Sequence, residues 1–146
     1  KLPKAIGEVA YVAIGMPSLS VYVPYYQGME HYLPGYDKGT DKFSDDSVSW
    51  KYRQLQTLVM QNYNAYAPEV EKAYAEFEKN TAVQQTAMEK EYLKLYQSQP
   101  QQAQKVLQAF EDKVMQDALS LTEQLTSQVM TQMTHDTDIK YHFEGA

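Results

Sequence analysis

The chain has 146 residues, a net charge of -6 and no cysteine. This length is enough for one domain with a hydrophobic core. The charge argues against a nucleic-acid partner, because phosphate binding needs clustered Lys and Arg. The absence of cysteine excludes disulfides, thiolate metal sites and a cysteine nucleophile within these residues. No apolar run approaches the roughly 18 residues that suggest a membrane span, so we expect no membrane partner.

The composition divides the chain into two regions. Residues 1–45 are rich in Tyr, Pro and Gly, whereas residues 46–134 contain no glycine. This contrast predicts strands and a loop followed by helices. The chain starts at Lys1 with neither an initiator Met nor a signal peptide, so we expect that start to be a cloning or processing boundary.

Two strands are predicted in the first region. The segment Glu8–Ile14 is apolar at nearly every position, which is typical of a strand buried on both faces. Gly15–Ser18 supplies a turn, and Ser20–Val23 is the second strand. Pro24 cannot donate to a ladder, so it ends this strand or lies on an edge. A two-stranded hairpin is marginal alone, so a doubly buried one needs sheet partners that this chain does not supply.

Residues 27–45 are predicted to form a long loop. Loops of this length are usually functional or disordered, but Tyr32, Leu33, Tyr36 and Phe43 indicate that this one packs down. We favour a connector that wraps the core. The alternative is a cover over a substrate cleft.

Three helices are predicted next. The first begins near Ser44–Ser47, which offers N-cap residues and acids, and the second begins at Ala67–Glu69, where Pro68 suits a first turn. The third follows Pro100 and keeps an apolar spacing of three or four through Met133. Short connections predict that the two long helices form an antiparallel hairpin. The first helix then crosses them or packs against the sheet.

The helical period is lost after residue 134. Residues 139–143 are predicted to form a last strand or an extended docking segment, and Gly145 and Ala146 to fray. We therefore interpret residues 1–146 as a single segment or domain, with strands and an aromatic loop (1–45), helices (46–134) and a tail (135–146).

Few residues indicate chemistry directly. The tail carries four side chains of types that bind metals, but nothing in their spacing indicates that they converge on one point, so we expect no metal site. These residues are His135, Asp136, Asp138 and His142. Ser44, Ser47 and Ser49 lack a nucleophile motif, and capping explains the first two. Trp50 and Arg53 lie on adjacent turns and are able to stack or to hold a carboxylate. The interpretation that we favour is a core Trp50 with Arg53 bridging to Asp45 or Asp46.

A motif between Gly15 and Arg53 resembles the C-terminal region of the bacterial cysteine dipeptidases, a branch of the N-terminal-nucleophile hydrolases. Its residues are Gly15-Met16-Pro17, Ser20-Val21-Tyr22-Val23-Pro24-Tyr25-Tyr26, Gly28, Pro34, Tyr36, Phe43-Ser44 and Ser47-Val48-Ser49-Trp50-Lys51-Tyr52-Arg53. The similarity covers about residues 3–66.

The resemblance implies the fold and function of a larger protein. The family fold is a four-layer αββα sandwich, to which this chain would supply the last strands (Glu8–Ile14 and Ser20–Tyr25) and C-terminal helices in an α+β arrangement. The nucleophile is an amino-terminal cysteine whose own α-amine acts as base, and it would lie upstream of Lys1. No catalytic residue is therefore expected in this chain, which alone would be inactive and would serve as a scaffold.

The resemblance also implies partners. They are a dipeptide substrate, the upstream part of the same protein and further copies in a homo-oligomer, with no cofactor and a cytoplasmic location. The residues expected near the substrate are Tyr25, Tyr26, Trp50 and Arg53.

Two other interpretations stay open. The chain is alternatively a stand-alone helical module whose Gln-rich hairpin, Tyr74–Gln132, binds a protein partner without catalysis. The isolated chain is also expected to self-associate if the strand edge is exposed.

Overall fold

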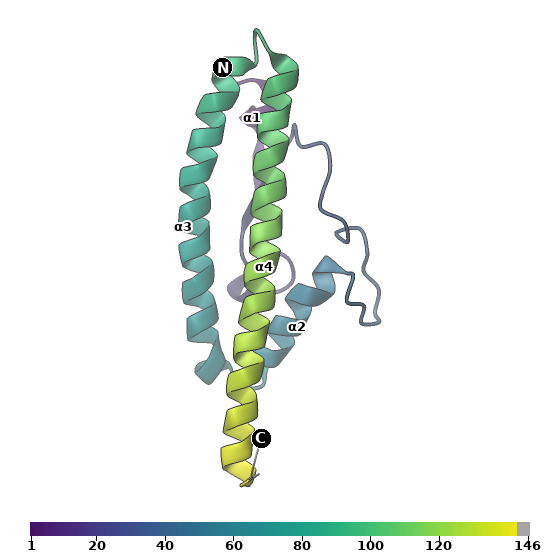
Figure 1. Cartoon of the computed structure of the whole chain (residues 1–146), viewed down its shortest axis with the longest axis vertical. Helices are drawn as coiled ribbons and strands as arrows, with labels where there is room; N and C mark the ends of the chain where they lie inside the picture. Colours follow the sequence, from purple (N-terminus) through teal and green to yellow (C-terminus); the bar gives the residue numbers. More distant parts are fainter. Residues whose placement is uncertain (143–146) are drawn as a thin grey trace.

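The computed structural model describes residues 1–142 as an elongated α+β arrangement, as predicted (Figure 1). A β-hairpin and a long loop come first, and three helices follow. Two long helices, α3 and α4, lie side by side, and α2 crosses them near the end where α3 begins. The elements are α1 (Lys4–Gly7), β1 (Val9–Val12), the 3-10 turn η1 (Pro17–Leu19), β2 (Val23–Tyr26), α2 (Val48–Met60), α3 (Tyr63–Leu95) and α4 (Pro100–Tyr141).

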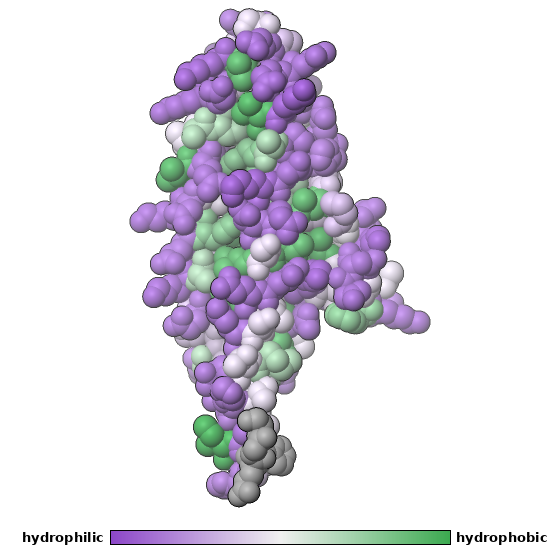
Figure 2. Space-filling view, in the orientation of Figure 1, coloured by the Kyte–Doolittle hydropathy of each residue, from purple (hydrophilic) through white to green (hydrophobic). Residues whose placement is uncertain are grey.

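The predicted antiparallel hairpin of long helices is confirmed. Only residues 96–99 separate α3 from α4, and Pro100 occupies the first turn of α4, where its missing N–H is no loss. The two helices bury apolar side chains against each other, and a buried hydrogen bond of 2.7 Å joins the hydroxyls of Tyr74 and Thr122. Figure 2, in the orientation of Figure 1, shows a mostly hydrophilic surface with apolar patches between the hydrophilic side chains.

Helix α2 begins where the capping residues predict. The Ser47 hydroxyl accepts a hydrogen bond from the Trp50 amide at 3.4 Å, which satisfies one free N–H of the first turn. The apolar face of α2 then packs on the helical hairpin, mainly on α4. Its fully buried side chains include Val48, Tyr52, Leu55 and Val59.

The predicted start of the second helix is wrong by four residues. Helix α3 begins at Tyr63, so Pro68 lies inside it rather than in its first turn. A proline at this position removes one backbone hydrogen bond, but its fixed φ suits a helix. Tyr66, Ala67 and Val70 are all buried around it, and their burial offsets the lost bond.

The predicted end of the third helix is also wrong for the described residues. Helix α4 continues to Tyr141, so residues 139–141 are neither a strand nor extended. The last turns of α4 project beyond α3 into solvent (Figure 1), and Ile139 is 74% exposed. Because these turns are exposed, they need no apolar face. Asp136 helps to hold this part, because its carboxylate accepts hydrogen bonds of 2.8 Å from Tyr66 and Gln132. Phe143, Gly145 and Ala146 lie outside the described residues.

The β-hairpin is shorter than predicted and is buried on one strand only. Val9 pairs with Tyr26 and Val12 with Val23 in an antiparallel register. Strand β2 packs on α4, whereas Val9 and Tyr11 of β1 are 37% and 57% exposed. The predicted double burial of the first strand is therefore wrong in this structure. Within residues 1–142 the sheet has two strands, and nothing covers the outer side of β1.

Pro24 lies inside β2, opposite Tyr11, so it does not end the strand. Both strands of a two-stranded sheet are edge strands, so Pro24 lies on an edge strand, which is the second of the two predicted positions. Residues 20–22, which are predicted to begin the strand, form an irregular segment between η1 and β2, in which Ser20 and Val21 are buried. The Gln56 side chain fixes the turn before them, donating to the Ile14 carbonyl at 2.9 Å and accepting from the Met16 amide at 3.1 Å.

Leu55 provides a test of this packing. Leu55 lies on α2, which packs on the helical hairpin, and it is fully buried. Leu55→Ala should therefore lower the free energy of unfolding by about 2–5 kcal/mol, because burial is lost and a cavity is left. The matched control is Leu93→Ala, at a leucine that is 40% exposed, which should cost less than about 1 kcal/mol. Urea titration followed by circular dichroism measures both, and equal losses would contradict the packing described here.

Candidate functional site

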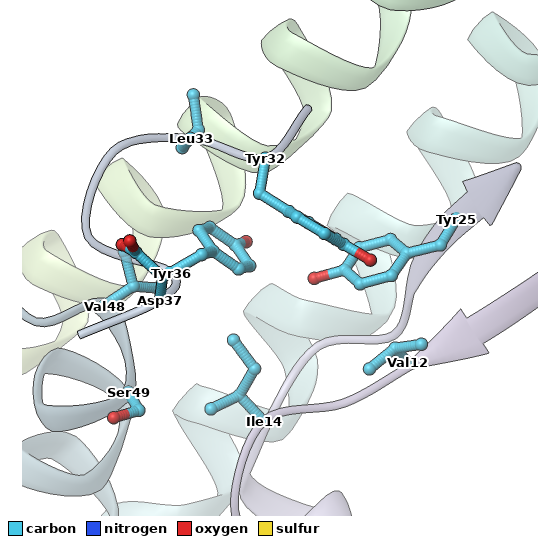
Figure 3. Close-up of a pocket in the computed structure, with 9 residues that line it drawn as sticks. All are labelled: Val12, Ile14, Tyr25, Tyr32, Leu33, Tyr36, Asp37, Val48 and Ser49. Carbon is cyan, nitrogen blue, oxygen red and sulfur yellow. The ribbon is translucent and has the colours of Figure 1, made fainter. Parts of the chain in front are cut away.

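A cleft of about 630 Å³ opens between the β-hairpin, the long loop and the start of α2. This volume suits a small organic ligand. Figure 3 shows its walls, with aromatic rings from β2 and the loop on one side and aliphatic side chains from the end of β1 below them. The lining residues are Val12, Ile14, Tyr25, Tyr32, Leu33, Tyr36, Asp37, Val48 and Ser49.

Three tyrosines form a contiguous aromatic wall. The rings of Tyr25 and Tyr32 meet edge to face with centroids 5.4 Å apart, and Tyr32 stacks on Tyr36 at 5.8 Å. These separations are typical of favourable aromatic pairs. The wall presents ring faces and hydroxyls to the cleft, so it suits an apolar or cationic ligand.

The loop that carries this wall is packed down in part, as predicted. Leu33 and Tyr36 lie against the core, but Tyr32 and Phe43 are 53% and 62% exposed. Gly35 sets the local path. Its φ of 95° favours glycine, and a Cβ there would lie 2.4 Å from the Asp46 carbonyl oxygen. The Gly35 carbonyl also accepts from the Val48 amide at 3.1 Å, which ties Tyr36 to the start of α2.

Glutamines of α4 hold the other end of the loop. The Gln108 side chain accepts from the Glu30 amide at 2.7 Å and donates to the His31 carbonyl at 3.1 Å. Gln104 donates to the Gly28 carbonyl at 2.6 Å. These bonds satisfy backbone groups that have no regular secondary structure to pair with.

Behind the aromatic wall lies a buried carboxyl group. Glu111 of α4 is 0% exposed, and its Oε1 accepts from the Tyr26 amide at 2.9 Å. Its Oε2 has no hydrogen-bond partner among the described residues. Burial raises the pKa of Glu111 to about 7, and the charge of Asp112 adds to the rise, while the bond from Tyr26 opposes it.

Two cleft hydroxyls lie near this carboxyl group. The hydroxyls of Tyr25 and Tyr36 point toward one another (Figure 3). That of Tyr36 is buried, and the Tyr25 hydroxyl is the polar group that faces it. Burial is the main cause of the raised pKa of both tyrosines; the two hydroxyls also act on each other, and the charge of Glu111 makes the smallest contribution to each pKa. Glu111, Tyr25 and Tyr36 therefore form one electrostatic group, which we call the carboxyl–tyrosine cluster.

The residues predicted near a substrate are not all in this cleft. Tyr25 lines it, but Tyr26 points to the opposite face because side chains alternate along a strand. The Tyr26 hydroxyl donates to Glu89 of α3 at 2.5 Å, and its ring meets Phe110 edge to face. Burial, followed by Glu89, raises the pKa of Tyr26.

Trp50 and Arg53 lie beside the cleft residue Ser49, outside the lining. The Arg53 guanidinium stacks over the Trp50 ring at 4.2 Å, as one sequence interpretation proposed. The interpretation that we favoured is wrong: Trp50 is only half-buried, and Asp46 pairs with Lys38 at 2.6 Å. The role of Tyr25, Tyr26, Trp50 and Arg53 near a substrate stays a prediction.

Two further findings bear on function. Among residues 1–142, no three His, Asp or Glu side chains gather in a way that would hold a metal ion. In the same residues no helix has the length and hydropathy needed to cross a bilayer. Sequence reasoning missed Glu111. The available signal was its place four residues after Leu107, next to Phe110 on the apolar face of α4.

The raised pKa of Glu111 makes stability depend on pH. Because the folded-state pKa of about 7 lies above the ordinary value of 4.5, the folded state holds this proton more tightly. The contribution of Glu111 to stability is thus fully present below pH 4.5 and is lost as the pH rises through 7. Between pH 5 and pH 8 the loss should be about 2 kcal/mol.

Glu111→Gln should remove that loss, because the amide does not titrate. Urea unfolding of the wild type, Glu111→Gln and Glu91→Gln at the two pH values measures it. Glu91 is an exposed glutamate of α3, so its variant should keep the wild-type pH dependence. The same pH dependence in wild type and Glu111→Gln would show that Glu111 does not titrate abnormally.

Comparison with known proteins places this cleft within a family match. The sequence profile of Peptidase family C69 matches residues 1–76, just over half of the chain. A protein named "Probable dipeptidase" from Salmonella dublin is 77% identical over 39 residues, which are 27% of this chain and 9% of that protein. The match therefore covers less than a tenth of the length of that relative. No solved structure matches significantly. On the profile match, the chain belongs to peptidase family C69.

Proposed function

We propose that this chain is the C-terminal part of a dipeptidase and forms one wall of its substrate cleft. The observation that carries the proposal is the family match over residues 1–76, which contain all nine residues that line the cleft. The name of the Salmonella dublin relative supports the substrate class. The resemblance to the cysteine dipeptidases implies an amino-terminal cysteine nucleophile, and we place it upstream of Lys1 because these residues contain no cysteine.

The exposed strand β1 supports the proposed place in a larger sandwich. Val9 and Tyr11 of β1 are 37% and 57% exposed, and within residues 1–142 β1 pairs with β2 alone; an unpaired strand edge is a ready template for a further strand. Upstream strands of an N-terminal-nucleophile sandwich would cover it. In this proposal the 146 residues act as a scaffold and have no activity alone. The complete enzyme works as a cytoplasmic homo-oligomer without a cofactor.

The alternative of a stand-alone helical binding module has less support. Its main feature was the Gln-rich hairpin, but Gln104 and Gln108 bind the loop backbone within the chain. Gln85 likewise exchanges hydrogen bonds with the Tyr11 hydroxyl of β1. These glutamines are therefore occupied internally and do not require a protein partner.

A hydrolysis assay tests the proposed function. The source protein, with the residues that precede Lys1, should begin with cysteine when mature and should release both amino acids from dipeptides. Changing that cysteine to serine, or using residues 1–146 alone, should lower turnover by at least about a thousandfold, because nucleophile and base reside on one group. Chromatography of the products gives the rates, and intact mass gives the mature start. A full-length protein that cleaves no dipeptide, or a serine variant that stays active, would refute the proposal.

A further inference from the structure

The cleft has a marked charge asymmetry. Asp37 is the charged residue among the nine that line it, and the buried carboxyl group of Glu111 lies behind its tyrosines. The neighbouring Lys38 does not balance them, because its ammonium binds Asp46 at 2.6 Å. His31, on the same loop, is likewise paired with Asp112 at 3.2 Å. The lining of the cleft itself therefore carries negative charge, which favours a cation.

The wall adds a second feature that suits a cation. The ring centroid of Tyr32 lies 5.4 Å from that of Tyr25 and 5.8 Å from that of Tyr36, and such clustered aromatic rings attract ammonium groups. The opposite wall is aliphatic, from Val12, Ile14 and other side chains (Figure 3). A fitting ligand thus joins an ammonium group to an apolar body.

Unused hydrogen-bonding capacity is the third feature. Within residues 1–142 Oε2 of Glu111 is buried without a hydrogen-bond partner, and the buried Tyr36 hydroxyl has only the Tyr25 hydroxyl facing it. Buried polar atoms are rarely left unpaired. A donor group in the cleft would supply the Tyr36 hydroxyl oxygen with a further hydrogen bond. An ammonium group supplies three donors and no acceptor, so it complements this cluster, whereas a carboxylate would oppose it.

We propose that this cleft binds the protonated N-terminal amine of a peptide together with an apolar first side chain. The ammonium group sits among the three tyrosine rings between Asp37 and the carboxyl–tyrosine cluster, and the side chain lies on Val12 and Ile14. The identification of the ligand as a peptide substrate rests on the proposed function. The preference of the cleft for an ammonium group rests on the lining of the cleft alone.

A charge series on one ring tests the ligand class. Phenethylammonium, 2-phenylethanol and phenylacetate share an aromatic body and differ in charge. Titrated calorimetrically into residues 1–146 at pH 8, the ammonium compound should bind at least about tenfold more tightly than phenylacetate, with the alcohol between them. Equal or tighter binding of phenylacetate would overturn the proposal, as would a failure of phenethylammonium to bind.

Variants assign the selectivity to named groups. Asp37→Asn, at an exposed loop position, and Glu111→Gln should each reduce the preference for ammonium over alcohol about fivefold or more. Glu91→Gln removes the same charge from an exposed site on α3 and should leave the preference unchanged. If Glu111→Gln does not fold, Asp37→Asn still decides, because an unchanged preference there would place the cation elsewhere.

The pH dependence provides an independent readout. Alkyl ammonium groups stay protonated up to about pH 10, so a change near pH 7 reports on the protein. Phenethylammonium should bind more weakly at pH 5.5 than at pH 8, because Glu111 is then protonated, and Glu111→Gln should abolish that difference. The groups that face Glu111 are Tyr25, Tyr26, Tyr36 and Asp112. A pH dependence that is unchanged in Glu111→Gln would overturn its part in the site.

A final comparison separates a peptide from a free amine. Phenylalanylglycine should bind at least as tightly as phenethylammonium at pH 7, and its N-acetyl form at least about tenfold more weakly. Weaker binding of the dipeptide than of phenethylammonium would refute the peptide as occupant. These measurements need no turnover. Binding by this chain with no hydrolysis by the full-length protein would refute the proposed function alone, and hydrolysis without binding would refute this inference alone.

Discussion

The hydrogen bond from the Tyr26 amide to Glu111 is the constraint on which the site depends. Strand β2 uses one edge to pair with β1, so its other edge must find acceptors on α4, and Glu111 supplies one at 2.9 Å. An acid there is costly, because burial disfavours its charged form. A buried amide without an acceptor would also be costly. This hydrogen bond therefore places a carboxyl group behind the tyrosines of the cleft.

Other side chains of the helices likewise pair with backbone groups of the turn after β1 and of the long loop. Gln56 holds the turn after β1, and Gln104 and Gln108 hold the start of the loop. Amide side chains suit this task because each carries both a donor and an acceptor. The loop has little regular structure of its own, yet Gln104 and Gln108 fix its start on α4, and Gln56 fixes the earlier turn on α2. The cleft is thus built on rigid elements even though a loop forms much of its wall.

Local sequence signals predicted the helices better than the sheet. Ser47 and Pro100 mark helix starts because capping and proline geometry act within one turn. The ends of α3 and α4 depended on more distant contacts. Pro68 is tolerated inside α3 because the residues around it are buried, and α4 runs past residue 134 because it projects into solvent. The exposure of β1 could not be read from its apolar sequence, since burial depends on what lies next to it in space.

The cleft shows the same limit. A motif drew attention to Tyr25 and the loop tyrosines, but only the fold brings them within reach of Glu111, which lies 85 positions from Tyr26. Strand alternation separates Tyr25 from Tyr26, a consequence of pleating that adjacent letters in a motif conceal. An acid on the apolar face of α4 was the one sequence sign of this arrangement. Here the Tyr26 amide uses one carboxyl oxygen of Glu111, while the other has no hydrogen-bond partner among the described residues.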